Sequence, residues 1–303
     1  MGKAVNPRKI LFVCTGNVFR SMTAKYCLMD YLKRKGISDT VINSAGTVAK
    51  KEGINPTLYG SLISLGIDPS GHRQKRLTKK DLLENDIVIV MAQSHADFIQ
   101  RKFGFDNVTL FNSIVNGEDT SVLDVDDVVK DPNGREAKKY IRDTARYIHR
   151  SVPALYTHLD DYLLFLDFIN GRKTQMKGFP FMPLHETKNT IAFMSISIPQ
   201  KEDGHILVIP KKRYTHLDAV PKPILAELIG TVTTVGKALR RTHGGYNVLL
   251  NNGRAAGQYV FHTHFHIIPR NRKDDIRIEV WKSKKLTFDE FVSLNERIRN
   301  ALA

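Results

Sequence analysis

The stretch ILFVCTGNVFRS, from Ile10 to Ser21, decides the fold of the first half of the chain. Its first four residues form an apolar run that is typical of a buried strand, and a helical pattern of apolar residues follows Ser21. The residues between them form a short loop that leads from strand to helix. In such a loop, backbone N–H groups at a helix N-terminus make a nest that binds a tetrahedral oxyanion and stabilises a thiolate.

Cys14 and Arg20 stand at opposite ends of this loop. A Cys is more often a small buried hydrophobe than a nucleophile. Here its position between a strand and a helix, with Gly16, Asn17 and Ser21 in the same loop, favours a nucleophilic thiolate aimed at phosphorus. The planar fork of Arg20 can hold two phosphate oxygens at once.

At these residues the chain resembles the low-molecular-weight protein tyrosine phosphatases, whose loop reads C-x-G-N-x-C-R-S. The chain departs from that pattern at Phe19, where the family usually has a second Cys, and at Met22, where it usually has Pro. The resemblance implies that Cys14 attacks phosphorus while Arg20 stabilises the transition state. It also implies a phosphate-binding loop of six further residues, Thr15, Gly16, Asn17, Val18, Phe19 and Ser21.

Phosphoryl transfer from an ester also needs an acid that protonates the leaving group. The chain offers four candidates close together, and chemistry alone does not choose among Asp124, Asp126, Asp127 and Asp131. The resemblance chooses Asp131, because the family's acid is the Asp of an Asp-Pro pair late in the domain. Pro132 also restricts the backbone of Asp131 to an extended conformation, which helps to fix the direction of the carboxylate.

The resemblance also bears on loop support and on substrate. Ser44 and His72 match residues that hold Asn17 and the loop in shape. Family members that act on phosphotyrosine usually have aromatic pocket walls, whereas Asn133-Gly134 follows the Asp-Pro pair here. Val18 replaces the Thr of related protein-arginine phosphatases, so phosphotyrosine is favoured over phosphoarginine. Phosphoarginine and small phosphomonoesters both stay open as alternatives.

Strands and helices alternate through the first half of the chain. This alternation predicts a four-stranded parallel sheet with helices on both faces and ligands at the carboxyl ends of its strands. Cys27 falls on the apolar stripe of the helix after the loop, so we expect it in the core. The further predicted strands are Thr40–Asn43, Ile87–Met91 and Val108–Phe111, and the further predicted helices are Thr57–Leu65, Ser94–Phe103 and Arg135–Tyr156.

A second pattern begins near Leu159, so the predicted domains are 1–158 and 159–303. Strands grouped around one long helix indicate an α+β domain with an antiparallel sheet. Its predicted elements are helix Tyr162–Ile169, loop Asn170–Lys188, strands Thr190–Ile196 and His205–Pro210, helix Lys222–Thr242, and strands Tyr246–Leu250 and Phe261–Ile268.

The centre of this second domain is the run His262-Thr263-His264-Phe265-His266. On a strand, period two places the three imidazoles on one face. Such a face indicates a metal site or nucleophilic and proton-transfer chemistry on phosphate. Neighbouring residues on one strand face splay apart, and no nearby Cys pair completes a zinc site. We therefore expect neither a metal nor any other cofactor.

The stretch NNGRAAGQYVFHTHFHIIPR closely resembles the histidine-triad (HIT) family, with its pattern H-x-H-x-H, and the resemblance covers about Asp167–Arg272. It implies that His264 attacks an α-phosphate and forms a nucleotidyl-histidine intermediate, which water hydrolyses. It implies that His262 and His266 orient and polarise the phosphate. Four further residues match nucleotide-binding positions of the family, namely His205, Asn251, Gln258 and Ser197.

Two features refine this second resemblance. Ser197 stands where the family usually has a ribose-binding Asp or Asn, which weakens the case for nucleoside binding. The Ala-Gly-Gln context of Gln258 favours the dinucleoside-polyphosphate hydrolase branch over the phosphoramidase branch. HIT domains commonly pair through their sheets, so the resemblance also implies a homodimer through this half of the chain.

Composition limits the remaining choices. The net charge is +15, and 24 Lys and Arg against 17 Asp and Glu precede Leu159, so the basic excess is not confined to one tail. The excess suits phosphate-bearing substrates, and nucleic acid is a weaker candidate. No apolar run approaches the roughly 18 residues of a membrane span, and the N-terminus lacks a hydrophobic signal region. Two Cys in 303 residues favour a reducing compartment, so we expect a cytoplasmic protein with no membrane partner.

Three functions follow from these patterns. The primary hypothesis is a bifunctional hydrolase, a phosphatase that acts on phosphorylated proteins or small phosphomonoesters, fused to a nucleotide hydrolase. The second is a phosphatase regulated by a HIT module that only senses nucleotide, which the Ser197 departure motivates. The third is nucleic-acid end processing, in which one domain removes AMP and the other a terminal phosphate. It fits the basic pI, but no zinc finger or RNA-binding motif supports it.

Overall fold

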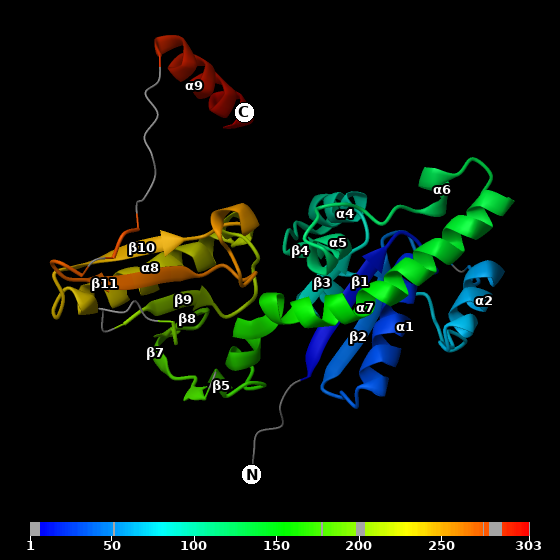
Figure 1. Cartoon of the computed structure of the whole chain (residues 1–303), viewed down its shortest axis with the longest axis horizontal. Helices are drawn as coiled ribbons and strands as arrows, with labels where there is room; N and C mark the ends of the chain where they lie inside the picture. The colour runs from blue at the N-terminus through cyan, green and yellow to red at the C-terminus, as the bar shows by residue number, and fades with distance from the viewer. Residues whose placement is uncertain are drawn as a thin grey trace.

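The computed structural model describes residues 7–50, 52–176, 178–197, 204–274, 276–278 and 287–302. Its two larger sheets lie in the N-terminal and C-terminal halves of the chain, and the long helix α7 (Arg135–Ile169) runs from one half into the other (Figure 1). Among the helices of these described ranges, none is long and apolar enough to cross a membrane.

The first sheet has four parallel strands, as predicted, and their order is β2-β1-β3-β4. Alternate residues of β1 face opposite ways. Ile10 and Phe12 pack with α1, α2 and α7, whereas Leu11 and Val13 pack with α3 and α4. Helices therefore cover both faces. The strands are β1 (Arg8–Cys14), β2 (Thr40–Gly46), β3 (Ile87–Val90) and β4 (Val108–Leu110).

The helices that the sequence predicted in this half lie close to their predicted positions. Cys27 is fully buried in the core of α1, which confirms the prediction for that residue. The sequence patterns missed the short helices α3, α5 and α6. The helices are α1 (Arg20–Arg34), α2 (Pro56–Ser64), α3 (Lys79–Glu84), α4 (Gln93–Phe103), α5 (Phe111–Val115) and α6 (Val125–Val128).

Helix α7 corrects one prediction, because it is a single helix of 35 residues where we expected two with a break between them. Its buried stripe continues through the expected break at Leu155, Leu159 and Tyr162. Pro153 lies within the helix, and the hydroxyl of Thr157 donates to its carbonyl at 3.0 Å. The domain boundary at residue 158 therefore falls inside a helix that contributes to the cores of both halves.

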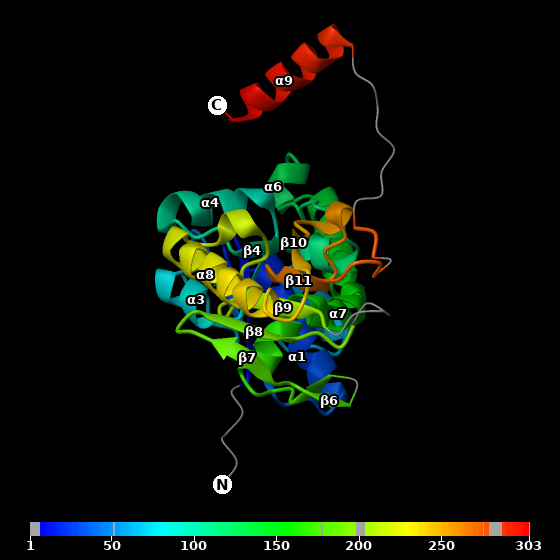
Figure 2. The ribbon, with the colours of Figure 1, turned by 90° about the vertical axis from the view of Figure 1, so that its left-hand side faces the viewer.

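The second sheet is antiparallel, as predicted, and has five strands in the order β10-β11-β9-β8-β7 (Figures 1 and 2). The long helix α8 (Lys222–Leu239) packs on one face of it. Figure 1 draws α9 (Phe288–Leu302), which the patterns missed, away from both sheets. The strands are β7 (Pro183–Glu186), β8 (Thr190–Met194), β9 (Ile206–Pro210), β10 (Gly245–Leu250) and β11 (Phe265–Arg270).

Two predictions in this half were wrong. The expected loop 170–188 contains β7 and a small hairpin of β5 (Gln175–Met176) and β6 (Phe179–Pro180). The expected strand from Phe261 begins only at Phe265. The backbone N–H of Phe261 donates to Asp161 in α7 at 2.5 Å, and that of Thr263 donates to Tyr214 at 2.6 Å. These bonds leave the sheet, so only His266 of the three histidines lies within β11.

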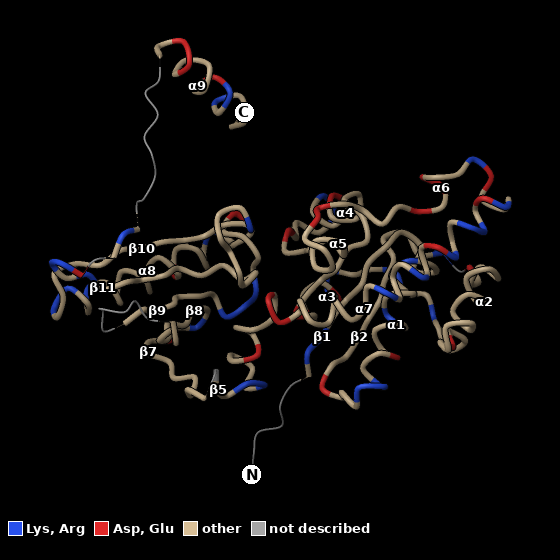
Figure 3. Tube along the Cα trace, in the orientation of Figure 1, with Lys and Arg blue, Asp and Glu red and all other residues tan. Residues whose placement is uncertain are grey.

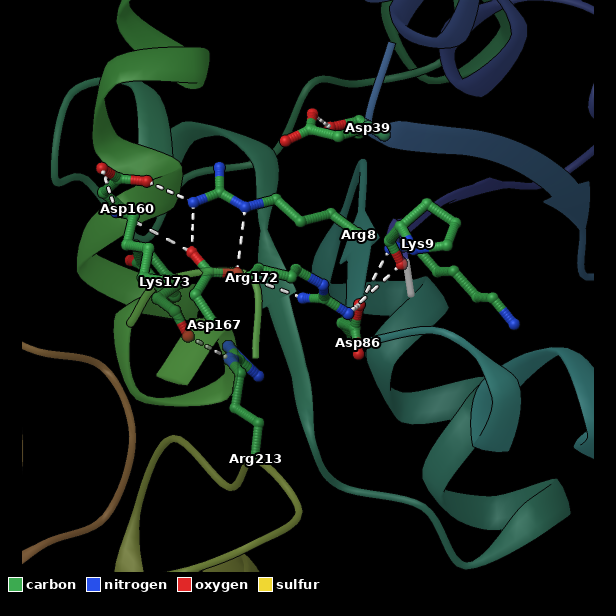
Figure 4. A network of polar contacts seen from close by, with 12 residues as sticks. Arg8, Lys9, Asp39, Asp86, Asp160, Asp167, Arg172, Lys173 and Arg213 are labelled. Atoms are coloured by element: carbon green, nitrogen blue, oxygen red, sulfur yellow. Dashed lines mark hydrogen bonds and ion pairs between the residues drawn. The ribbon is translucent and has the colours of Figure 1, made fainter. Parts of the chain in front are cut away.

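Ion pairs fasten the beginning of β1 to the end of α7 (Figure 4). Arg8 is ion-paired with Asp160 and Asp167, and Arg172 pairs with Asp167 at 3.1 Å and with Asp86 at 2.7 Å. The side chain of Asp167 is fully buried. Its carboxylate therefore lies between the guanidinium groups of Arg8 and Arg172. These two ion pairs offset the loss of hydration of the buried carboxylate.

Arg213 links the two halves a second time. It is fully buried and donates to the carbonyl of Tyr162 at 3.1 Å, to Oδ1 of Asn107 at 3.0 Å and to the hydroxyl of Thr109 at 3.0 Å. Asn107 and Thr109 belong to the N-terminal half, at β4. The loop after β9 is thus held against the first sheet by hydrogen bonds.

We expect Asp167→Asn to lower the free energy of unfolding by about 3 kcal/mol, because it leaves two arginines without their buried charge partner. Urea unfolding of the full chain measures the loss. The control is Lys173→Ala, since Lys173 approaches the same carboxylates with a side chain that is 34% exposed. An exposed pair contributes less than about 1 kcal/mol. Equal losses in the two variants would contradict this account of the junction.

Candidate active sites

The loop after β1 curls around the thiol of Cys14, the last residue of that strand. Asn17 adopts a left-handed backbone conformation, with φ of 58°, and its N–H donates to Sγ at 3.3 Å. The side-chain amide of Asn17 donates to the hydroxyl of Ser21 at 3.0 Å. Because that oxygen accepts from Asn17, its own proton is free to point at Sγ, 2.9 Å away. Ser21 is therefore placed to stabilise a thiolate.

Neighbouring segments hold the loop in this shape. The N–H of Lys75 donates to the side chain of Asn17 at 2.9 Å, and Nε2 of His72 lies 2.6 Å from the carbonyl of Asn17. A Cβ at Gly46 would lie only 2.6 Å from the carbonyl of Thr15, so only glycine fits beside the loop there. His72 thus touches the residue that the resemblance assigned to it. Ser44 is buried, and its hydroxyl makes no hydrogen bond with any residue that the structure describes.

Arg20, the first residue of α1, is almost wholly buried beside the loop. It is ion-paired with Asp124, and its Nη1 donates to the carbonyl of Val122 at 2.9 Å. Its Nη2 also donates to the hydroxyl of Thr15 at 3.1 Å. Its Nε is buried and has no partner in the described part of the chain.

His95 completes this cluster, although no motif in the sequence singled it out. Its Nε2 lies 3.0 Å from the hydroxyl of Thr15. Burial and the nearby charge of Arg20 lower the pKa of His95 to about 3, so the ring is neutral. Its place after a buried strand, at the sheet edge where ligands bind, is the signal that could have found it.

Among the described residues, Asp131 makes no hydrogen bond or ion pair with the Cys14 loop. The residue is exposed in the turn before α7, and its Oδ1 accepts from the N–H of Asn133 at 3.0 Å. Within the described residues its hydrogen bonds stay in its own turn. Of the four acidic candidates, Asp124 is the one in contact with Arg20.

The second candidate site lies where β11 begins. Nδ1 of His264 is 2.7 Å from the carbonyl of His262. A carbonyl only accepts, so Nδ1 carries the proton and Nε2 keeps the lone pair that a nucleophile needs. Burial and the neighbouring His205 lower the pKa of His264, which keeps the imidazole neutral. The ring of Phe165 in α7 packs edge-on against it, with centroids 5.3 Å apart.

Hydrogen bonds hold the other three histidines in place beside His264. Nδ1 of His205 lies 2.6 Å from the carbonyl of Ser197, and its Nε2 lies 2.9 Å from Nδ1 of His266. By the same reasoning, His266 donates from Nδ1, and its buried Nε2 has no partner in the described residues. His262 is fully buried with Nε2 2.8 Å from the carbonyl of Pro210. Burial and Arg213 lower its pKa to about 3.

The two predicted nucleotide-binding amides make hydrogen bonds to backbone groups of their own loop, and one of them also reaches the loop after β9. Gln258 is buried, accepts from the N–H of Gly253 at 2.7 Å and donates to the carbonyl of Thr215 at 2.8 Å. Asn251 donates to the carbonyl of Gly257 at 3.4 Å. The hydroxyl-bearing residue Ser197 is exposed at the edge of the site. The three therefore lie around the histidines, and their contacts to a nucleotide stay a prediction.

The sequence matches two family models, the low molecular weight phosphotyrosine protein phosphatases over residues 9–162 and the HIT domain over residues 183–273. The first match spans half of the chain. A HIT-like protein of Methanocaldococcus jannaschii is 37% identical over 128 residues, which are 42% of this chain and 93% of that protein. The chain belongs to both families.

Named relatives give further points of comparison. The adenosine 5'-monophosphoramidase HNT1 of Candida albicans is 35% identical over 135 residues, 42% of this chain and 88% of that protein. Among solved structures, the YwlE arginine phosphatase from Geobacillus stearothermophilus shares 26% identity at a TM-score of 0.43, over 52% of this chain and 96% of that chain. The two family models confirm both resemblances, the one drawn from the loop and the one drawn from the histidine run.

The lowered pKa of His264 predicts the pH dependence of nucleotide turnover. If His264 attacks phosphorus, as the resemblance implies, its imidazole must be neutral, and the neutral form is lost only as the pH falls below the pKa of that imidazole. That pKa lies below the ordinary value of 6.5. We therefore expect kcat/KM for nucleotide hydrolysis to stay constant from pH 8 to 6.5 and to fall only at lower pH. Circular dichroism at each pH checks that the protein remains folded, and an acidic midpoint above 6.5 would contradict the assignment.

Proposed function

We propose that the protein is a bifunctional hydrolase, with a cysteine-dependent phosphatase in its first half and a nucleotide hydrolase in its second. One observation supports this above the others. Each half presents a complete nucleophile within its own stretch of chain, a thiol held by Asn17 and Ser21 and an imidazole whose Nδ1 is occupied by a carbonyl. Neither arrangement needs a group from the other half.

In the proposed phosphatase reaction, the thiolate of Cys14 attacks phosphorus in line, and an S–P bond forms as the bond to the leaving oxygen breaks. Arg20 and the loop N–H groups stabilise the equatorial oxygens. Asp131 protonates the leaving oxygen and then accepts a proton from the water that hydrolyses the phosphocysteine. Oδ1 of this carboxylate accepts from the N–H of Asn133, which leaves Oδ2 for the proton transfer.

Leaving-group dependence tests Asp131. Asp131→Ala should lower kcat/KM for phenyl phosphate, whose leaving group needs a proton, by about a hundredfold or more. It should lower kcat/KM for p-nitrophenyl phosphate far less, because that leaving group departs well without a proton. Asp126→Ala, an exposed aspartate of the same segment, serves as the control. Equal effects on both substrates would remove Asp131 from the acid role.

We propose phosphotyrosine in a protein as the phosphatase substrate, since Val18 offers no hydroxyl to a phosphoarginine. Phosphoarginine peptides and small phosphomonoesters belong in the same assay as alternatives. For the second site, the named activity of the Candida relative favours a nucleoside phosphoramidate over the dinucleoside polyphosphates that Ala-Gly-Gln indicates. There Nε2 of His264 attacks the α-phosphorus, the bond to the leaving group breaks, and water then releases the nucleotide.

A specific contact favours one alternative, a phosphatase regulated by nucleotide. Gln258 of the nucleotide loop donates to Thr215, whose N–H donates to Asn107 of the phosphatase half at 3.2 Å. Nucleic-acid end processing is less favoured, because Lys and Arg are spread over both halves of the trace rather than gathered in one stripe (Figure 3). We also propose, from the resemblance, a cytoplasmic homodimer that pairs through β10, an edge strand of the described sheet.

Two point variants test the bifunctional proposal. Cys14→Ser should reduce aryl-phosphate hydrolysis by more than a hundredfold and leave nucleotide hydrolysis unchanged, because a lost nucleophile has no substitute in the other half. His264→Asn should do the reverse. Each variant is thus the folding control for the other. If either variant abolishes both activities in a folded protein, the sites are not independent. That result would favour the alternative, a phosphatase regulated by nucleotide.

A further inference from the structure

The guanidinium of Arg20 offers two edges, and the structure leaves only Nε of the side edge without a partner among the described residues. At the outer end, Nη1 donates to the carbonyl of Val122 at 2.9 Å and Nη2 is paired with Asp124. Nη2 also donates to the hydroxyl of Thr15 in the Cys14 loop at 3.1 Å, whereas Nε has no partner in the described part of the chain, although the side chain is 1% exposed. A buried donor without an acceptor costs free energy. The side edge, Nε with Nη2, is the pair that holds two oxygens of a phosphate.

Hydrogen bonds that do not involve Arg20 hold the backbone next to Asp124 in place. The N–H of Val122 donates to the carbonyl of Met91, at the end of β3, at 2.7 Å. The hydroxyl of Tyr140 in α7 donates to the carbonyl of Leu123 at 3.0 Å. The segment is therefore tied to the first sheet on one side and to α7 on the other.

The two oxygens of Asp124 have separate tasks. Oδ1 accepts from the N–H of Val125 at 3.0 Å at the start of α6, whereas Oδ2 pairs with Arg20. Asp127 in turn accepts from the N–H of Asp124 at 3.0 Å, which completes a capping box. The side chain of Asp124 is 31% exposed, but this double anchoring fixes its direction.

We propose that Asp124 is a positioning residue of the phosphatase site, and that it holds the outer end of Arg20 so that Nε and Nη2 face a phosphate in the Cys14 loop. The proposal rests on the proposed phosphatase function. It differs from a general acid, because Asp124 acts through Arg20 and transfers no proton. It also differs from an anion that merely occupies the place of phosphate, because Nε of Arg20 keeps no partner among the described residues while Asp124 is bound.

The signs of the expected effects separate these three roles. If Asp124 positions Arg20, then Asp124→Asn weakens phosphate binding and slows good and poor leaving groups by the same factor. If Asp124 were a competing anion, the same variant would bind phosphate more tightly. If it were the acid, the loss would concentrate on poor leaving groups. Asn is itself a good helix N-cap, so this variant keeps the start of α6 intact.

The experiment is a calorimetric titration of inorganic phosphate into three full-length proteins. One carries Cys14→Ser alone, the second carries Cys14→Ser and Asp124→Asn, and the third carries Cys14→Ser and Asp126→Asn. Asp126 is the matched control because it is exposed and makes no hydrogen bond or ion pair among the described residues. We expect Asp124→Asn to raise the Kd for phosphate about tenfold or more, and Asp126→Asn to leave it unchanged. In the protein that keeps Cys14, Asp124→Asn should lower kcat/KM for phenyl phosphate and for p-nitrophenyl phosphate by the same factor.

Each other result overturns the inference. An unchanged or lower Kd in Asp124→Asn would show that Arg20 needs no such support, and a loss confined to phenyl phosphate would make Asp124 the acid. Both results would leave the proposed phosphatase function standing. If the Cys14→Ser protein binds no phosphate at all while it remains folded, the proposed phosphatase function falls as well. Circular dichroism of all variants establishes the folded state.

Discussion

The buried carboxylate of Asp167 is the interaction on which the arrangement of the two halves depends. It lies at the end of α7, between Arg8 of the first sheet and Arg172, which also reaches Asp86 (Figure 4). Burying a carboxylate costs several kcal/mol unless strong partners offset the loss of water. Two arginines from different segments supply those partners only when β1 and α7 meet in one geometry. The pairing thus specifies how the halves join more than it adds stability.

Arg213 extends this junction to the second active site. Burial lowers its pKa to about 10, so it still carries its charge at neutral pH, and its described partners are neutral oxygens of Tyr162, Asn107, Thr109 and Thr215. That charge contributes to keeping His262 neutral. Burial is the larger cause, and a residue that fastens the halves together adds to it at a histidine next to the nucleophile. The interface and the second site are coupled electrostatically.

Local patterns predicted what depends on local sequence. The apolar strands, the loop from Cys14 to Ser21 and the histidine run gave both sheets and both families. The errors arose where distant segments decide. The start of β11 depends on bonds from Phe261 to α7 and from Thr263 to the loop after β9, and the continuity of α7 depends on two cores that share one helix. His95 escaped notice, and Asp124 was not separated from the other acidic candidates, because only the folded sheet brings them to Thr15 and Arg20.

The two nucleophiles meet opposite electrostatic demands, and the fold separates them accordingly. A thiol reacts as an anion, so its loop needs N–H groups, a hydroxyl and a guanidinium close to sulfur. An imidazole attacks when neutral, so it needs burial, and a carbonyl at Nδ1 to leave Nε2 unprotonated. A shared cavity would favour one at the expense of the other. One rigid helix with Phe165 at the second site and its N-terminal half against the first sheet lets both environments coexist in one chain.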